Sequence, residues 1–136
     1  MTAPWDVLVL SYQAENRRAL CTMLQRQGVS TLSAATLQEC RDAISQGKIG
    51  LVFSDRSLPD GTYQDLLQAT RTLPRKVRVV VTSDQADWDD YLEAIRLGAF
   101  DVIPAPCRRA DVEWMLIQAK RDERTVATTN AARDAA

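Results

Sequence analysis

The chain contains 136 residues, which is the size of one domain that buries roughly two-thirds of its unfolded surface. Its 17 Lys and Arg residues nearly balance its 18 Asp and Glu residues, so the net charge of −1 argues against nucleic-acid or membrane-surface binding that is driven by bulk charge. The chain has no His, which excludes His-based nucleophiles, His metal ligands and a His phosphodonor.

The first half of the chain alternates short apolar runs with helical patterns. Val7–Leu10 is apolar at every position, which is typical of a strand that is covered on both faces. A helical pattern then ends before Gly28, and a weaker strand candidate follows at Ser30–Ala35. Thr36–Glu39 has the spacing of a capping box, which predicts the start of a second helix. A third strand is predicted at Gly50–Phe53.

The second half repeats this alternation. Helical patterns are predicted over Thr62–Thr72, Asp87–Leu97 and from about Ala110 to Arg124. A strand is predicted at Val77–Val81, and a weaker one at Phe100–Pro104. Five strands that alternate with five helices indicate an α/β fold with a doubly wound, five-stranded parallel sheet. Any functional cleft of such a fold lies beyond the carboxyl ends of its strands.

The last residues differ in composition from the rest of the chain. Residues 125–136 are mostly Ala, Thr, Asn and Asp, with almost no large apolar side chain. We therefore expect a domain over residues 1–124, followed by a flexible tail or linker over residues 125–136.

The cysteines and the hydropathy pattern indicate a compartment. Cys21, Cys40 and Cys107 are odd in number, widely spaced and without a CxxC pair, as in proteins of reducing compartments. No apolar run approaches the roughly 20 residues that a membrane span needs. The chain is therefore expected to be cytoplasmic, with no membrane partner.

Polar and small residues follow the predicted strands at the edge of the sheet where a cleft is expected. They are Ser11, Tyr12, Asp55, Arg56, Ser57, Thr82, Ser83 and Ala105. With no His in the chain, chemistry at this edge would use carboxylates, hydroxyls, thiols or amines.

Three segments around these residues resemble those of response regulator receiver domains, the phosphoacceptor modules of two-component signalling. The segments are Leu51–Gly61, Val79–Ser83 and Gly98–Pro106, and they occur in the family's order on the matching strands. The resemblance extends over Val7–Lys120 and implies the flavodoxin-like (βα)5 receiver fold. It also implies a sensor histidine kinase or an output protein as the partner.

The resemblance assigns roles to several of these residues. Asp55 takes the position of the phosphoacceptor, Thr82 that of the switch hydroxyl, and Ser57 that of the backbone carbonyl that binds Mg²⁺. The acidic pair that follows the first strand in the family is replaced by Ser11 and Tyr12. The family's Lys after the fifth strand is replaced by Ala105, and its switch aromatic on that strand by Val102.

These replacements predict weak phosphorylation chemistry. Losing one preorganised charge partner of a phosphoryl transition state costs about 3–4 kcal/mol. We therefore expect no enzymatic activity, and no cofactor beyond a weakly bound Mg²⁺ held by Asp55 and the Ser57 carbonyl. The leading hypothesis is a receiver domain that acts through protein–protein contacts. One alternative is a working phosphoacceptor that catalyses phosphotransfer to Asp55, and another is a small-molecule-binding protein of the same fold.

Three neighbouring charges are candidates to replace the missing groups. Arg56 could pair with Asp55 or a phosphate, although a solvated loop Arg is the favoured interpretation. Glu15 and Asp60 could supply a carboxylate, but their positions differ from the family's metal site and favour surface acids.

Exposed aromatic residues indicate an interaction surface. The fourth helix, the fifth strand and the fifth helix form the partner and dimer surface of the family that the chain resembles. This surface carries Trp88, Val102, Trp114 and Ile117. This face is a candidate surface for a homodimer, and the alternative is that the rings lie down over the edge of the core.

A basic cluster lies at the other end of the sheet. It consists of Arg71, Arg75, Lys76 and Arg78, without interleaved aromatic residues or a recognition helix. This pattern favours a solvated loop and predicts that the domain binds no nucleic acid.

Overall fold

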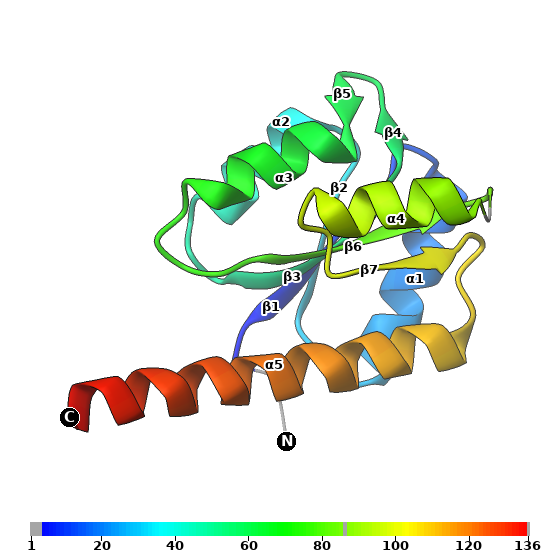
Figure 1. The fold of residues 1–136 in the computed structure, drawn as a ribbon. Coiled ribbons are helices and arrows are strands. Elements are labelled where there is room, and N and C mark those ends of the chain that lie inside the picture. Colours follow the sequence, from blue (N-terminus) through cyan, green and yellow to red (C-terminus); the bar gives the residue numbers. More distant parts are fainter. Residues whose placement is uncertain (1–3, 86, 136) are drawn as a thin grey trace.

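A parallel five-stranded sheet forms the centre of the protein in the computed structural model, which describes residues 4–85 and 87–135, with side chains up to residue 124 (Figure 1). The strand order is β2-β1-β3-β6-β7. The strands are β1 (Asp6–Leu10), β2 (Thr31–Ala34), β3 (Ile49–Asp55), β6 (Arg78–Ser83) and β7 (Asp101–Pro104). The doubly wound fold predicted from the sequence is confirmed.

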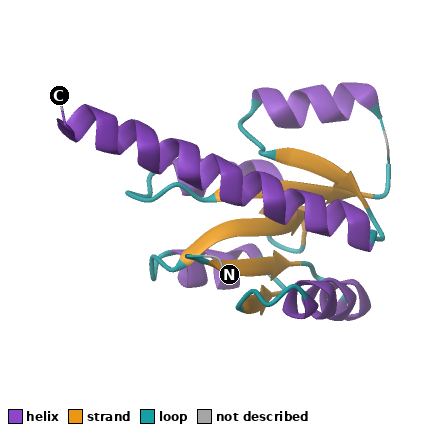
Figure 2. Ribbon diagram, turned by 90° about the horizontal axis from the view of Figure 1, so that it is seen from below, coloured by secondary structure: helices purple, strands orange, loops and turns teal. Residues whose placement is uncertain are grey.

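Five helices cover the two faces of this sheet. They are α1 (Ala14–Arg26), α2 (Leu37–Ile44), α3 (Tyr63–Arg71), α4 (Trp88–Arg96) and α5 (Arg109–Ala135). Core residues of α1 and α5 pack together with one set of strand residues, and those of α2, α3 and α4 pack with the other set. Figure 2 shows α5 lying across one face of the sheet. Right-handed crossovers in a parallel sheet lead to this two-sided arrangement.

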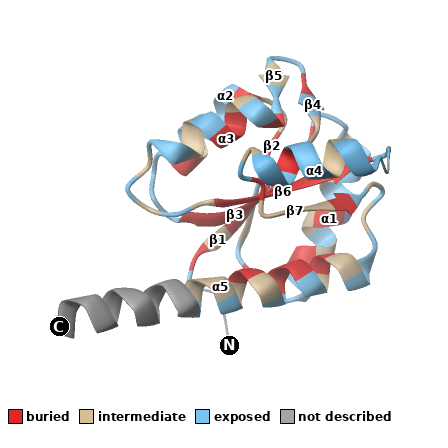
Figure 3. Cartoon of the chain, viewed as in Figure 1, coloured by how far each residue is buried: buried red, intermediate tan, exposed pale blue. Residues whose placement is uncertain are grey.

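The burial of the strands follows from their apolar sequences. The six residues of β6 are all buried, as are the first six of β3, whereas the edge strand β2 is partly exposed. Figure 3 shows the buried residues concentrated in the central strands and on the helices beside them. Because nearly continuous apolar strands are stable only when both faces are covered, they require helices on both sides.

A short hairpin that the sequence does not predict lies between β3 and α3. Its strands are β4 (Ser57–Leu58) and β5 (Gly61–Thr62), which pair antiparallel. Gly61 has a φ of 155°, and a Cβ there would lie 2.4 Å from the side chain of Leu37, so the turn requires glycine. Thr62 then caps α3 through its hydroxyl, in a capping box with Asp65.

The last helix is longer than the sequence predicts. α5 continues past Arg124 to Ala135, so residues that were expected to begin a tail are helical. Their role as a flexible tail or linker stays a prediction. Among the described residues, no helix combines the length and the apolar character that crossing a bilayer requires.

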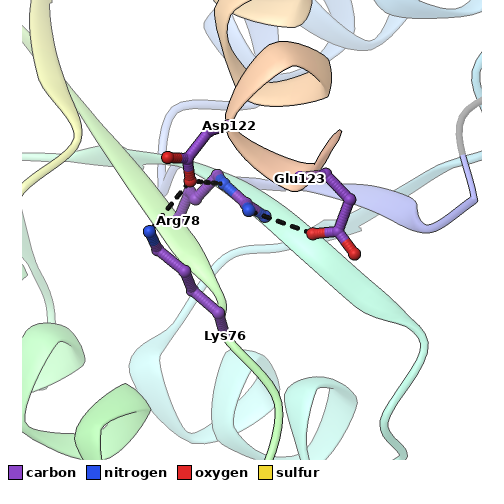
Figure 4. Close-up of polar contacts among 4 residues, drawn as sticks. All are labelled: Lys76, Arg78, Asp122 and Glu123. Atoms are coloured by element: carbon purple, nitrogen blue, oxygen red, sulfur yellow. Dashed lines mark hydrogen bonds and ion pairs between the residues drawn. The ribbon is translucent and has the colours of Figure 1, made fainter. Parts of the chain in front are cut away.

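Within the basic cluster at the amino ends of the strands, Arg71 and Lys76 are exposed, as expected of a solvated loop, whereas Arg78 is not. The Arg78 side chain is fully buried, and it donates from Nε to Asp122 at 2.5 Å and from Nη2 to Glu123 at 3.0 Å (Figure 4). Lys76 Nζ also pairs with Asp122, at 2.9 Å. Burial alone would raise the pKa of Asp122, but the hydrogen bonds and charges of Lys76 and Arg78 outweigh it and lower this pKa. These ion pairs join α5 to the sheet.

Candidate functional site

The carboxyl ends of three adjacent strands bring the expected site residues together. Asp55 ends β3 and pairs in register with Thr82 on β6, and Ser11 follows β1. A cleft of about 530 Å³ opens above them. Its lining includes six of the residues expected from the sequence, which are Tyr12, Asp55, Arg56, Ser57, Thr82 and Ala105. Ser11 is buried beside Asp55 and lines a smaller cavity that adjoins it.

Both carboxylate oxygens of Asp55 accept hydrogen bonds from the protein itself. The Tyr12 backbone N–H donates to Oδ2 at 3.2 Å, and the Thr82 hydroxyl donates to Oδ1 at 3.4 Å. The Thr82 hydroxyl also lies 3.4 Å from the Ser54 carbonyl. The donors that reach the carboxylate are therefore neutral groups, and no ion pair to Asp55 is seen among the described side chains.

Burial dominates the ionisation of Asp55. Desolvation raises its pKa above the ordinary value of an aspartate, while hydrogen bonds from Ser11, Tyr12 and Thr82 and the charge of Arg17 act in the opposite direction. Arg17 donates to the Ser11 carbonyl at 2.7 Å, so its guanidinium is engaged at the rim of the site.

The raised pKa of Asp55 predicts a pH-dependent cost of folding. The folded state binds more protons than the unfolded state between the two pKa values, so stability falls as pH rises through that range. Asp55→Asn removes the buried charge; its carbonyl oxygen can accept from the Tyr12 N–H, and its NH₂ group can donate to the Thr82 hydroxyl, which then donates to the Ser54 carbonyl. We expect the melting temperature of this variant at pH 7 to be higher than that of the natural chain, because the desolvated charge is gone. The gain should be only about 1–4 °C, because Asp55 is partly exposed and water screens its charge. Calorimetry at pH 7 and pH 3.5 measures this, and an equal difference at both values would contradict it.

Arg56 does not pair with Asp55. Its Nη2 forms an ion pair of 2.9 Å with Asp90 Oδ1 on α4, and its side chain remains 38% exposed, so it is a partly solvated loop Arg with a partner that the sequence did not indicate. Asp60 accepts hydrogen bonds from the backbone N–H groups of Leu37 at 2.8 Å and Gln38 at 3.1 Å, and therefore caps α2. Glu15 is exposed in the first turn of α1. Arg56 and Asp60 are thus committed to other contacts.

Sequence reasoning missed several residues of the cleft. Gln13, Asn16, Asp84 and Gln85 also line it. Asp84 directly follows β6, so its place at a strand's carboxyl end was a usable signal. The amides of Gln13 and Asn16 bond to each other at 2.6 Å, an arrangement that no pattern in the sequence indicates.

The cleft has two carboxylates, those of Asp55 and Asp84, and lacks the acidic pair that receiver domains carry after the first strand. Mg²⁺ requires near-octahedral oxygen ligands and usually one or two carboxylates beside its waters. Among residues 4–85 and 87–135, no group of three or more His, Cys, Asp or Glu side chains is arranged to hold a metal ion. The Tyr12 N–H uses one of the acceptor positions of Asp55 Oδ2.

Comparison with known families agrees with this architecture. The model of the response regulator receiver domain family matches residues 7–116. The chain belongs to this family. The cleft at Asp55 therefore lies where receiver domains of two-component response regulators carry their phosphoacceptor site.

The receiver domain is similar to parts of longer curated proteins. It is 27% identical over 99 residues to response regulator protein PilR of Pseudomonas aeruginosa, covering 73% of this chain and 22% of that protein. It is 36% identical over 104 residues to protein-glutamate methylesterase/protein-glutamine glutaminase 1 of Myxococcus xanthus, covering 74% and 30%. The chain therefore spans less than a third of either relative.

Solved receiver domains share the fold of this one. The signal receiver domain of a Luxo repressor protein from Vibrio parahaemolyticus has a TM-score of 0.84 at 15% identity, over 93% of this chain and 98% of that one. The receiver domain of NtrX from Brucella abortus has a TM-score of 0.76 at 26% identity, over 85% and 98%. The beryllofluoride-activated NtrC4 receiver domain dimer has a TM-score of 0.79 at 20% identity, over 86% and 97%.

Large apolar side chains are exposed on α4 and α5 of this receiver domain. Trp88 is 68% exposed and stacks on Tyr91 with a centroid separation of 5.4 Å. Trp114 and Ile117 are 50% and 44% exposed, and the Arg121 guanidinium lies 5.9 Å from the Trp114 ring centroid. The expected interaction residues on the helices are thus on the surface, whereas Val102 is half-buried and lines a cavity under α4.

Proposed function

We propose that this receiver domain signals through protein–protein contacts and that Asp55 accepts phosphate very slowly or not at all. The arrangement of Asp55 carries the proposal, because neutral donors hold both of its oxygens. The acidic pair and the Lys of the family are replaced by Ser11, Tyr12 and Ala105. Each missing charge partner leaves negative charge on the transferred phosphoryl group uncompensated.

The proposed partners bind the face formed by α4, β7 and α5. Trp88, Trp114 and Ile117 supply exposed apolar area there, and such side chains often dominate the energy of protein interfaces. The partner is a sensor kinase, an output protein or a second copy of this chain. On this proposal the domain is not an enzyme and needs no cofactor, and any Mg²⁺ at Asp55 and the Ser57 carbonyl is weakly bound.

Incubation with a small phosphodonor tests the proposal. The chain is mixed with acetyl phosphate and Mg²⁺, and its intact mass is followed over hours beside an Asp55→Ala control. We expect no mass increase that depends on Asp55, because the transition state lacks its cationic partners. Stoichiometric modification within minutes that Asp55→Ala abolishes would instead establish a working phosphoacceptor.

A further inference from the structure

A cavity of about 310 Å³ lies between α4 and the strands β6 and β7. Val81, Val102 and Ala94 line its apolar part, and Trp88 and Tyr91 add aromatic walls. Protein interiors are normally packed without voids of this size, whereas small-molecule sites occupy roughly 300–1,000 Å³. Val102 and Ala94, two of the side chains that line this space, are small. We call it the α4 cavity.

The charges at the rim of the α4 cavity favour a cation. Asp87, Asp90 and Arg56 line it, so two carboxylates face one guanidinium and the net formal charge is −1. Arg56 is already paired with Asp90 at 2.9 Å. The faces of aromatic rings such as those of Trp88 and Tyr91 also attract cations. Asp87, the N-cap of α4, accepts a hydrogen bond from the Asp89 N–H at 2.9 Å but has no cationic partner among the lining residues, so an anionic ligand would meet net negative charge at the entrance.

The α4 cavity also adjoins the Asp55 cleft. Arg56 and Gln85 line both spaces. Gln85 is fixed by Ser83, whose hydroxyl accepts from the Gln85 N–H at 3.2 Å and donates to the Gln85 carbonyl at 3.0 Å. A molecule in the α4 cavity therefore contacts residues that also border the cleft.

We propose that the α4 cavity is a binding site for a small cation with a planar aromatic ring. The ring lies against Val102 and Ala94 beside the aromatic walls, and its ammonium group faces Asp87 at the rim. Such a site gives the domain an input that does not require phosphate on Asp55. Trp88 borders both this site and the proposed partner face, so small-molecule binding is measured on the chain alone, without a partner.

Two indole compounds of opposite charge test the site. The ¹⁵N-labelled chain is titrated at low ionic strength with tryptamine, which is a cation at pH 7, and with indole-3-propionate, an anion with the same ring. We expect saturable amide shifts at Ala94, Val102, Arg56 and Gln85 with tryptamine. Indole-3-propionate should bind on the order of tenfold more weakly, because it carries the opposite charge near a net charge of −1.

Matched variants locate the binding. Val102→Phe fills the cavity and should abolish the saturable shifts, whereas Leu32→Phe adds the same ring on the exposed edge strand β2 and should leave them unchanged. Asp87→Asn keeps an N-cap residue but removes one charge, so it should largely remove the preference for tryptamine. If Val102→Phe fails to give a folded spectrum, Ala94→Leu replaces it.

Three outcomes would overturn the proposal. They are the absence of saturable shifts with tryptamine, unchanged binding in a folded cavity-filling variant, and binding of indole-3-propionate that equals or exceeds that of tryptamine. None of them bears on the phosphodonor experiment, because that assay reads Asp55 alone.

Discussion

The variant with Ser11→Asp, Tyr12→Asp and Ala105→Lys is expected to accept phosphate on Asp55 at least about 10³-fold faster than the natural chain. The two new carboxylates complete a ligand set for Mg²⁺, and the Lys neutralises charge on the phosphoryl oxygens. Space for the Lys exists, since a cavity of about 90 Å³ touches both Ala105 and Asp55. The expected gain in phosphorylation rate is smaller than the product of the gains from the three substitutions taken singly, because all three groups neutralise charge on the same phosphoryl group.

Initial rates of mass increase with acetyl phosphate and Mg²⁺ measure this gain. The same three substitutions with Asp55→Asn serve as the control, and this chain should gain no phosphate. A chain carrying only Ala105→Lys should show an intermediate rate, because it still lacks the metal ligands. If the three substitutions leave a folded domain with an unchanged rate, missing charge is not what limits Asp55.

Removing both acids that face Arg78 is expected to destabilise the fold strongly. Asp122→Ala with Glu123→Ala leaves the buried guanidinium without its ion pairs, which costs about 3–5 kcal/mol in the free energy of unfolding. Adding Arg78→Met to this pair of substitutions should recover most of the loss, because Met fills similar space and carries no charge. The two acids are thus expected to stabilise the fold mainly by compensating the buried charge of Arg78.

Urea denaturation of the variants measures these differences. Arg109→Ala is the matched surface control, because Arg109 is largely exposed and its 3.4 Å pair with Glu113 should contribute at most about 0.5 kcal/mol. A double-acid variant as stable as the natural chain would show that water solvates Arg78 in the folded state. A failure of Arg78→Met to restore stability would show that the acids contribute through other contacts.

The fold was predictable because its signals are local. Nearly continuous apolar strands such as Val7–Leu10 and the capping pattern at Thr36–Glu39 specify both the element and its environment. The hairpin of β4 and β5 was missed because strands of two residues have no measurable periodicity. The end of α5 was misplaced because Ala-rich and Thr-rich composition does not by itself stop a helix.

The site was predictable in position and less so in its contacts. The carboxyl ends of parallel strands meet at one edge, which placed Asp55, Thr82 and Ala105 correctly along the cleft. The ion pair of Arg56 with Asp90 and that of Arg78 with Asp122 join residues far apart in sequence. Such pairs depend on how helices pack on the sheet, which no local pattern encodes. The α4 cavity depends on the same packing and was equally hidden.

The central claim is that Asp55 lacks the charged neighbours that a phosphoacceptor needs. A Mg²⁺ titration tests this claim most directly when it is followed through the amide signals of Tyr12, Asp55 and Ser57. Because Asp55 is the one carboxylate that the proposal gives to the metal, we predict no saturation or a dissociation constant in the millimolar range or weaker. Saturation at micromolar Mg²⁺, with shifts confined to these three residues and abolished in Asp55→Asn, would contradict the account.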